Sequence, residues 1–145
     1  MKRVRVGTSR IHYEGLFATI CLKKGTRIIR YIGEKITKDE SNRRLEAGNV
    51  YIFELNDYYS IDGKTLKNTA RYINHSCDPN CQAEQINNTI WIVAIKDIQD
   101  GEELTYNYGY DDNEYENNPC NCGAKNCCGY ILDRKYWGLI RQKRE

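Results

Sequence analysis

Alternating apolar and polar residues mark out a series of short strands along this chain. Residues 3–6 alternate strictly, and runs of strand length rich in β-branched or aromatic residues follow. These runs cover residues 26–36, 50–55, 58–62 and 89–95. Turns are expected at Lys24-Gly25, Asn56-Asp57 and Asn87-Asn88, because glycine and asparagine tolerate the positive φ of tight hairpins.

A helical signature lies between residues 37 and 49. Thr37 fits the N-cap, Glu40 is its reciprocal partner three residues on, and Gly48-Asn49 ends the helix. A short helical turn is expected over residues 68–73 and a further helix over residues 133–143. Because strands dominate otherwise and no repeat or linker interrupts them, the sequence predicts a β-rich α+β domain.

Length and charge limit the class of protein. A chain of 145 residues fits one domain with a single core. The formal net charge of +2 does not indicate a nucleic-acid binder with a basic surface. Residues 97–116 hold eight acids and no basic residue, so an acidic rim is expected to attract a basic peptide. Five basic residues in 134–144 suggest at most a weak nucleic-acid contact.

With no membrane span or secretory signal in the sequence, we expect an intracellular protein.

Cysteine spacing points to a metal. Six of the seven cysteines lie between Cys77 and Cys128, which favours metal binding in a reducing compartment over a disulfide framework. Cys120, Cys122 and Cys127 supply three thiols within eight residues and leave one corner of a tetrahedral site open. Four residues compete for that corner: Cys21, Cys77, Cys81 and Cys128.

Three separated motifs, in a fixed order, carry a resemblance. Asn74-His75-Ser76-Cys77 with Pro79-Asn80 comes first, the run from Gly101 to Tyr108 follows, and the Cys-x-Cys-x4-Cys segment comes last. Together they resemble the SET-domain protein lysine methyltransferases with their post-SET zinc motif, over about residues 7–131. The segment from Pro119 to Lys125 looks most like the trithorax class of histone H3 methyltransferases.

The resemblance implies an α+β, β-rich fold of several small sheets, with the chain near Asn74 threaded as a pseudoknot beside the tyrosine segment. It divides the chain into a SET domain (1–111), a post-SET zinc-binding segment (112–132) and a basic, helical C-terminal tail (133–145). It also selects Cys77 as the fourth ligand of one structural Zn²⁺, together with Cys120, Cys122 and Cys127.

A site for S-adenosylmethionine is implied by the same resemblance. Residues 11–18 look like the family's Gly-x-Gly loop, although Tyr13 stands where the first glycine usually lies and Glu14 follows it. An acid at position 14 would not pair with the cofactor carboxylate. The implied cofactor-binding residues are His12, Tyr13, Glu14, Gly15, Tyr51, Asn74, His75 and Asn121.

The implied chemistry needs a neutral amine, whereas free lysine has a pKa near ~10.4. A dry channel with aromatic walls would lower that pKa and orient the amine. By resemblance Tyr108 is catalytic and Tyr106 holds the position where a hydroxyl limits the product to mono- or dimethyllysine. Tyr51 completes the catalytic group, while Arg71 and Asp62 have structural roles.

The leading hypothesis is an S-adenosylmethionine-dependent protein lysine N-methyltransferase acting on a basic tail such as that of histone H3. The alternative is a catalytically silent SET fold that serves as a zinc-stabilised protein or nucleic-acid interaction module, which Tyr13 and Glu14 favour. The expected state is a monomer or weak dimer away from membranes. A eukaryotic source would place it on chromatin in the nucleus, and a bacterial source in the cytoplasm or secreted into a host.

Overall fold

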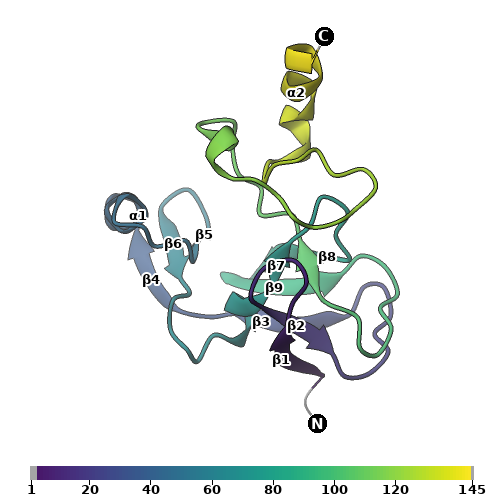
Figure 1. Ribbon diagram of the computed structural model, residues 1–145. Helices are drawn as coiled ribbons and strands as arrows, with labels where there is room; N and C mark the ends of the chain where they lie inside the picture. Colours follow the sequence, from purple (N-terminus) through teal and green to yellow (C-terminus); the bar gives the residue numbers. More distant parts are fainter. Residues whose placement is uncertain (1–2, 145) are drawn as a thin grey trace.

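The strands of this domain form small separate sheets. The computed structural model describes residues 3–144, with side chains as far as residue 140. Within that part of the chain there are four sheets (Figure 1). One sheet pairs β1 (Val4–Thr8) with β2 (Glu14–Ala18), and another has the order β3 (Arg27–Tyr31), β9 (Thr89–Ala94), β8 (Cys81–Ile86). A third has the order β4 (Glu34–Thr37), β6 (Tyr59–Asp62), β5 (Ile52–Glu54).

The fourth sheet joins two segments that are far apart in the sequence. β7 (Asn74–His75) runs parallel to β10 (Thr105–Tyr106), with Asn74 opposite Thr105 and His75 opposite Tyr106. The Asn74 segment therefore lies beside the tyrosine segment, as the resemblance implies.

Helices are few and short. They are α1 (Lys38–Glu46), the 3-10 turns η1 (Thr69–Tyr72), η2 (Tyr115–Asn117) and η3 (Arg134–Tyr136), and α2 (Trp137–Arg144). The predicted helices over residues 37–49, 68–73 and 133–143 are confirmed, the last as η3 followed by α2. The part of the chain from 3 to 144 contains no helix long and apolar enough to cross a membrane.

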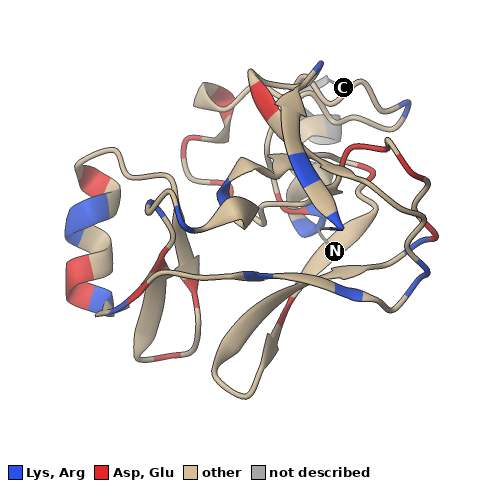
Figure 2. Ribbon diagram, turned by 90° about the horizontal axis from the view of Figure 1, so that it is seen from below, with Lys and Arg blue, Asp and Glu red and all other residues tan. Residues whose placement is uncertain are grey.

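α1 begins as its sequence predicts but uses one capping residue differently. The Thr37 hydroxyl accepts from the Glu40 N–H at 3.3 Å. The Glu40 carboxylate does not return to Thr37; it binds Arg43 and Arg44 on its own helix, where acids and bases alternate (Figure 2). Arg44 also reaches Asp62 at 2.7 Å, so the helix is tied to β6.

The strand prediction over residues 26–36 is wrong in one respect, because β3 ends at Tyr31 and β4 begins at Glu34 in another sheet. The break lies at Gly33, where a Cβ atom would come within 2.0 Å of the Asp62 carbonyl oxygen. β2, β7, β8 and β10 were not predicted. The turn at Asn87-Asn88 has positive φ, but Asn56-Asp57 does not; there the Asn56 side chain accepts from the Tyr58 and Tyr59 N–H groups.

Two apolar cores support the domain. The main core joins the sheets through side chains that are almost fully buried, among them Leu16, Ile73, Ile92 and Leu104. A smaller core of Tyr115, Leu132 and Ile140 lies within the C-terminal segment. That segment lies to one side of the sheets, with α2 at its far end (Figure 1).

Candidate functional site

A cavity of about 630 Å³ lies between the sheets and the C-terminal segment. Its walls come from five parts of the chain: residues 11–14, 50–51, 71–75, 108–110 and 117–121, with Ile131. Seven of the eight predicted cofactor-binding residues line it, namely His12, Tyr13, Glu14, Tyr51, Asn74, His75 and Asn121. The structure thus brings together residues that the sequence separates widely.

Gly15, the eighth residue, does not belong to the cavity wall. It is buried in β2, where a Cβ atom would lie 2.2 Å from Oε1 of Glu103. The same carboxylate oxygen lies 3.0 Å from Nδ2 of Asn74. The glycine is therefore needed for the close approach of Glu103, which helps to position Asn74.

The Asn74 side chain holds the N-terminal wall of the cavity. Its Nδ2 lies 3.2 Å from the His12 carbonyl oxygen and 3.0 Å from that of Glu14. Because a buried amide is stable only when its hydrogens find acceptors, these contacts fix the loop between β1 and β2 against β7.

Tyr13 adopts an unusual backbone conformation at the cavity wall. Its φ is 38°, in the left-handed region that glycine enters freely and other residues rarely adopt. The side chain is 82% exposed, and its ring meets the His12 ring edge-on at 4.4 Å between centroids. The backbone therefore keeps a glycine-like shape although a tyrosine occupies the position.

His75 links the cavity to the thiols behind it. Its Nδ1 accepts from the Tyr108 N–H at 3.0 Å, and its Nε2 lies 3.7 Å from Sγ of Cys77. Burial lowers the pKa of His75 to about 4. The ring is thus neutral at pH 7 and, with Nδ1 accepting, carries its proton on Nε2, directed at the Cys77 sulfur.

A second cavity of about 190 Å³ adjoins the first. Its aromatic lining includes Tyr31, Phe53 and Tyr106. Five residues line both cavities: Val50, Tyr51, Arg71, Tyr108 and Tyr110. The cavities therefore meet at a wall made mainly of tyrosine rings.

Tyr108 stands at this junction. Its hydroxyl donates to the Ile73 carbonyl at 2.7 Å, and its ring centroid lies 5.0 Å from that of Tyr106. Burial raises the pKa of Tyr108 and of Tyr106. Both hydroxyls are therefore protonated at neutral pH, and the surroundings disfavour charge.

Hydrogen bonds on both sides of the Tyr51 backbone fix it at the junction. The Asn49 side chain accepts from the Tyr51 N–H at 2.8 Å, while the Tyr31 hydroxyl donates to the Tyr51 carbonyl at 2.8 Å. Asp62 in turn accepts from Nδ2 of Asn49 at 3.0 Å. Burial alone would raise the pKa of Asp62, but hydrogen bonds from Asn49, Arg44 and the Lys64 N–H outweigh it and lower that pKa.

Arg71, for which the sequence suggested a structural role, lines both cavities and was not among the predicted site residues. Its guanidinium lies 4.3 Å from the centroid of the Tyr51 ring, and Nη1 donates to the Lys64 carbonyl at 2.7 Å. Its Nε is buried and has no hydrogen-bond partner among the described residues. The signal was its place three residues before Asn74, in a helical turn that had already been predicted.

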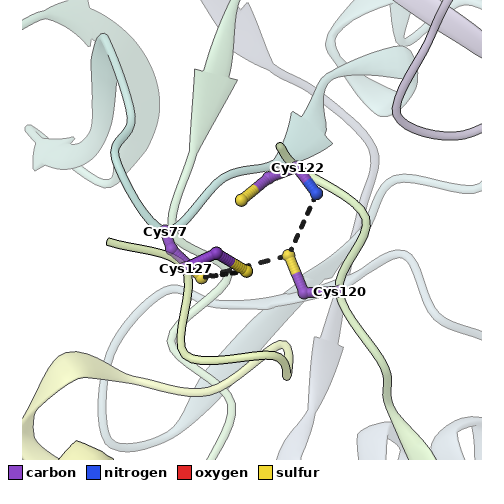
Figure 3. Close-up of side chains that lie close together, drawn as sticks. All are labelled: Cys77, Cys120, Cys122 and Cys127. Atoms are coloured by element: carbon purple, nitrogen blue, oxygen red, sulfur yellow. Dashed lines mark hydrogen bonds between the residues drawn. The ribbon is translucent and has the colours of Figure 1, made fainter. Parts of the chain in front are cut away.

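Four thiols converge at one place (Figure 3), and one of them, Cys77, is the thiol beside His75. The Sγ atoms of Cys77, Cys120, Cys122 and Cys127 all lie within 4.8 Å of one another. Cys77 Sγ is 3.9 Å from that of Cys120 and 3.7 Å from that of Cys127. A tetrahedral zinc with Zn–S bonds of about 2.3 Å requires sulfur separations of about 3.8 Å, so the donor set fits this metal.

The other candidates for the fourth ligand lie elsewhere. Cys81 is buried in the main core and Cys21 is exposed. Cys128 lies 3.9 Å from Cys77 but is not part of the four-thiol cluster. Burial raises the pKa of Cys77, the most deeply buried of the four thiols, so a metal bound there would have to displace a proton.

The predicted acidic rim does not form a wall of either cavity. None of the acids in residues 97–116, all of which the structure describes, lines them. Glu102 accepts from Asn80, and Glu103 from Ser9 and Asn74, so both serve the fold. In the tail, the side chains of Arg141, Lys143 and Arg144 lie outside the described residues.

The structure is a β-rich domain with a two-sided site. Small sheets lie around a parallel β7–β10 pair, two cavities meet at tyrosines, and a thiol cluster lies beside them. The family profile described as the SET domain matches residues 14–109, and the chain belongs to the SET domain family.

Named relatives agree with this assignment. The chain is 40% identical over 140 residues to the "Histone-lysine N-methyltransferase, H3 lysine-4 specific" of Schizosaccharomyces pombe, covering 90% of this chain and 15% of that protein. It is 37% identical over 137 residues to the "Histone-lysine N-methyltransferase trithorax" of Drosophila virilis, covering 88% of this chain and 4% of that protein. The predicted likeness to the trithorax class is confirmed. The chain spans only a small part of the length of these relatives.

A solved structure shares the fold. It is that of a humanized mutant of the Chaetomium thermophilum Polycomb Repressive Complex 2 bound to the inhibitor GSK343. The match has a TM-score of 0.67 at 37% identity and covers 74% of this chain and 15% of that one. The predicted SET fold of small sheets is thereby confirmed.

Proposed function

We propose that this chain is an S-adenosylmethionine-dependent protein lysine N-methyltransferase. The observation that carries the proposal is the meeting of the two cavities at Tyr108, Tyr51 and Tyr110. The larger cavity suits the cofactor and the smaller one suits a lysine side chain, so that donor and acceptor would face each other across this wall.

When bound, the cofactor supplies a methyl group on a positively charged sulfur. Seven of the eight predicted cofactor-binding residues line the larger cavity. The His75 ring in that wall is neutral, because burial lowers its pKa to about 4. Glu14 lines the same cavity, but its carboxylate would not pair with the carboxylate of the cofactor. The α-ammonium group of the cofactor is the better partner for this acid, and we assign it that role.

For the lysine, the smaller cavity supplies a dry and aromatic path. The burial that raises the pKa of Tyr106 and Tyr108 penalises charged groups, and it would lower the pKa of an entering ammonium for the same reason. Tyrosine faces still accept a cation during entry. In this proposal the Tyr108 hydroxyl positions the amine, and the Tyr106 hydroxyl leaves room for one or two methyl groups.

The four-thiol cluster is assigned to one structural Zn²⁺. Four thiolates leave no open position for water, so the ion would tie the C-terminal segment to the chain after β7. Residues 117–121 line the larger cavity, and the metal would thereby hold one wall of the cofactor site.

The proposed substrate is the tail of histone H3, at lysine 4, and the proposed place of action is chromatin. The name of the Schizosaccharomyces pombe relative states H3 lysine-4 specificity for that protein, and the name of the Drosophila virilis relative states histone-lysine methylation. Both relatives are eukaryotic. Glu54, at the smaller cavity, is an exposed acid that a basic tail can reach.

Incubation with labelled S-adenosylmethionine and a panel of H3 peptides tests the proposal. Transfer to a peptide with lysine at position 4, and none when arginine replaces it, is the expected result. Label on no peptide and on no intact histone would refute the proposed activity.

A silent interaction module is the second candidate, and Tyr13 is the observation that favours it. Its φ of 38° is strained for a non-glycine residue at the cofactor cavity. Calorimetry with S-adenosylhomocysteine separates the candidates, because a silent module would give no binding heat.

A further inference from the structure

A fifth thiol lies against the metal site without belonging to it. Sγ of Cys128 is 3.9 Å from Sγ of Cys77, and it donates to the Tyr130 carbonyl at 3.2 Å. Cys77 is only 2% exposed, whereas Cys128 is half-buried. Four other thiols already complete a tetrahedral set, so Cys128 has no place among the ligands.

We propose that Cys128 is an oxidation site, with hydrogen peroxide as the oxidant and Cys77 as the thiol that resolves the product into a disulfide. The proposal rests on the zinc site proposed above. Cys128 reacts first because it is the more exposed of the two sulfurs and is not shielded by coordination.

The two steps balance. The Cys128 sulfur attacks one oxygen of hydrogen peroxide, the O–O bond breaks, and a sulfenic acid and one water form. The Cys77 thiolate then attacks the Cys128 sulfur, so the S–S bond forms and the S–O bond breaks. The departing hydroxide takes a proton from solvent and leaves as the second water. Together the two cysteines lose two electrons, which reduce the peroxide.

The geometry favours this pair. A disulfide has an S–S length of about 2.05 Å, so the two sulfurs must approach by only about 2 Å. Among the described residues, Cys77 is the thiol that lies in contact with Cys128, whose other contact is the Tyr130 carbonyl.

Oxidation would change the site without detaching the segment. Cys77 alone among the four ligands comes from the chain before residue 112; the other three lie within residues 120–127. Its loss leaves the ion with three thiolates, and the wall formed by residues 117–121 loses its link through the metal to Cys77. The new disulfide at Cys128 still tethers the segment, so a reductant can restore the original site within one molecule.

The test uses the purified, zinc-loaded protein exposed to hydrogen peroxide. Zinc release is followed with a chromogenic chelator, and disulfides are mapped by mass spectrometry of a non-reduced digest. The Cys128→Ser variant keeps all four ligands, and Cys21→Ser is the matched control because Cys21 is an exposed thiol outside the cluster.

We expect a Cys77–Cys128 peptide in the wild type and in Cys21→Ser, and zinc release about tenfold slower in Cys128→Ser. Equal release in all three proteins, or disulfides confined to Cys120, Cys122 and Cys127, would overturn the proposal. Disulfide mapping still tests the Cys77–Cys128 proposal if the protein contains no zinc. Because neither readout uses methyl transfer, a protein without methyltransferase activity can still pass this test.

Discussion

Tyr108 and Tyr106 are neighbours with different positions in the site. Tyr108 lines both cavities, whereas Tyr106 lines only the smaller one. Their ring centroids are 5.0 Å apart. In the proposed function, the Tyr108 hydroxyl positions the amine while the Tyr106 hydroxyl occupies space beside it. This difference separates the effects of their substitutions.

Tyr108→Phe should lower kcat for methyl transfer by about 100-fold or more, because the group that positions the amine is lost. Tyr106→Phe should keep activity and shift the product toward trimethyllysine, since removal of its hydroxyl frees space. Mass spectrometry of the methylated peptide measures both effects. Tyr58→Phe, at an exposed tyrosine in the turn before β6, is the control. An unchanged product distribution in Tyr106→Phe contradicts the assigned role.

Tyr13 carries a backbone penalty that glycine would relieve. Tyr13→Gly should raise the free energy of unfolding by about 1 kcal/mol, because the left-handed conformation is disfavoured for a residue with a Cβ atom. Asn88→Gly is the matched control: Asn88 also has positive φ, but asparagine tolerates it. Chemical denaturation measures both. A Tyr13→Gly protein less stable than the wild type would show that the ring contributes more than the strain.

His75 should make stability depend on pH. Its pKa is about 4 in the folded protein and near 6.5 when unfolded, so the unfolded state binds the proton first. The free energy of unfolding therefore keeps its full value above pH 6.5 and decreases by about 3 kcal/mol as the pH falls to about 4. Denaturation of wild type and His75→Gln with excess zinc, at several pH values, isolates this effect. Parallel pH profiles would mean that His75 is not buried neutral.

Among the elements, local signals predicted local structure well. The Thr37 cap, the η1 turn and the Asn87-Asn88 hairpin follow from residues within a few positions of each other. The break between β3 and β4 does not, because Gly33 is required by the Asp62 carbonyl, which comes from another strand. β8 was missed because it lacks a continuous apolar run and gains its place by pairing with β9.

The candidate site likewise contains residues that local motifs predict and contacts that only the folded chain brings together. Its motifs predicted residues that line the larger cavity, since each lies in a recognisable run. The hydrogen bonds that hold the Tyr51 backbone could not be predicted from local sequence. They depend on Asn49, Asp62 and Tyr31, which come from three separate segments.

The C-terminal segment should depend on its metal more than the sheets do. Its own core is small, with Tyr115, Leu132 and Ile140 as its buried residues. Cys122→Ser, or zinc removal by a chelator, should weaken binding of S-adenosylhomocysteine by about tenfold or more, because residues 117–121 lose their anchor. Calorimetry measures the affinity, and Cys21→Ser should match the wild type. Full affinity in the zinc-free protein would contradict a metal-held wall.

In the whole molecule, several separate segments of the chain form the walls of the two adjoining cavities. β7 and the segment after β10 provide the Asn74 and Tyr108 walls, residues 50–54 line the smaller cavity, and residues 117–121 line the larger one. The two cavities share the wall formed by Tyr51, Tyr108 and Tyr110, so in the proposed function a donor in one cavity and an acceptor in the other would meet there.

A crystal structure with S-adenosylhomocysteine and an H3 peptide tests this arrangement most directly. We expect the cofactor product in the larger cavity, in contact with His75, and the lysine side chain in the smaller cavity with its Nζ beside the Tyr108 hydroxyl. A cofactor product bound outside the larger cavity, or a lysine that does not reach Tyr108, would contradict it.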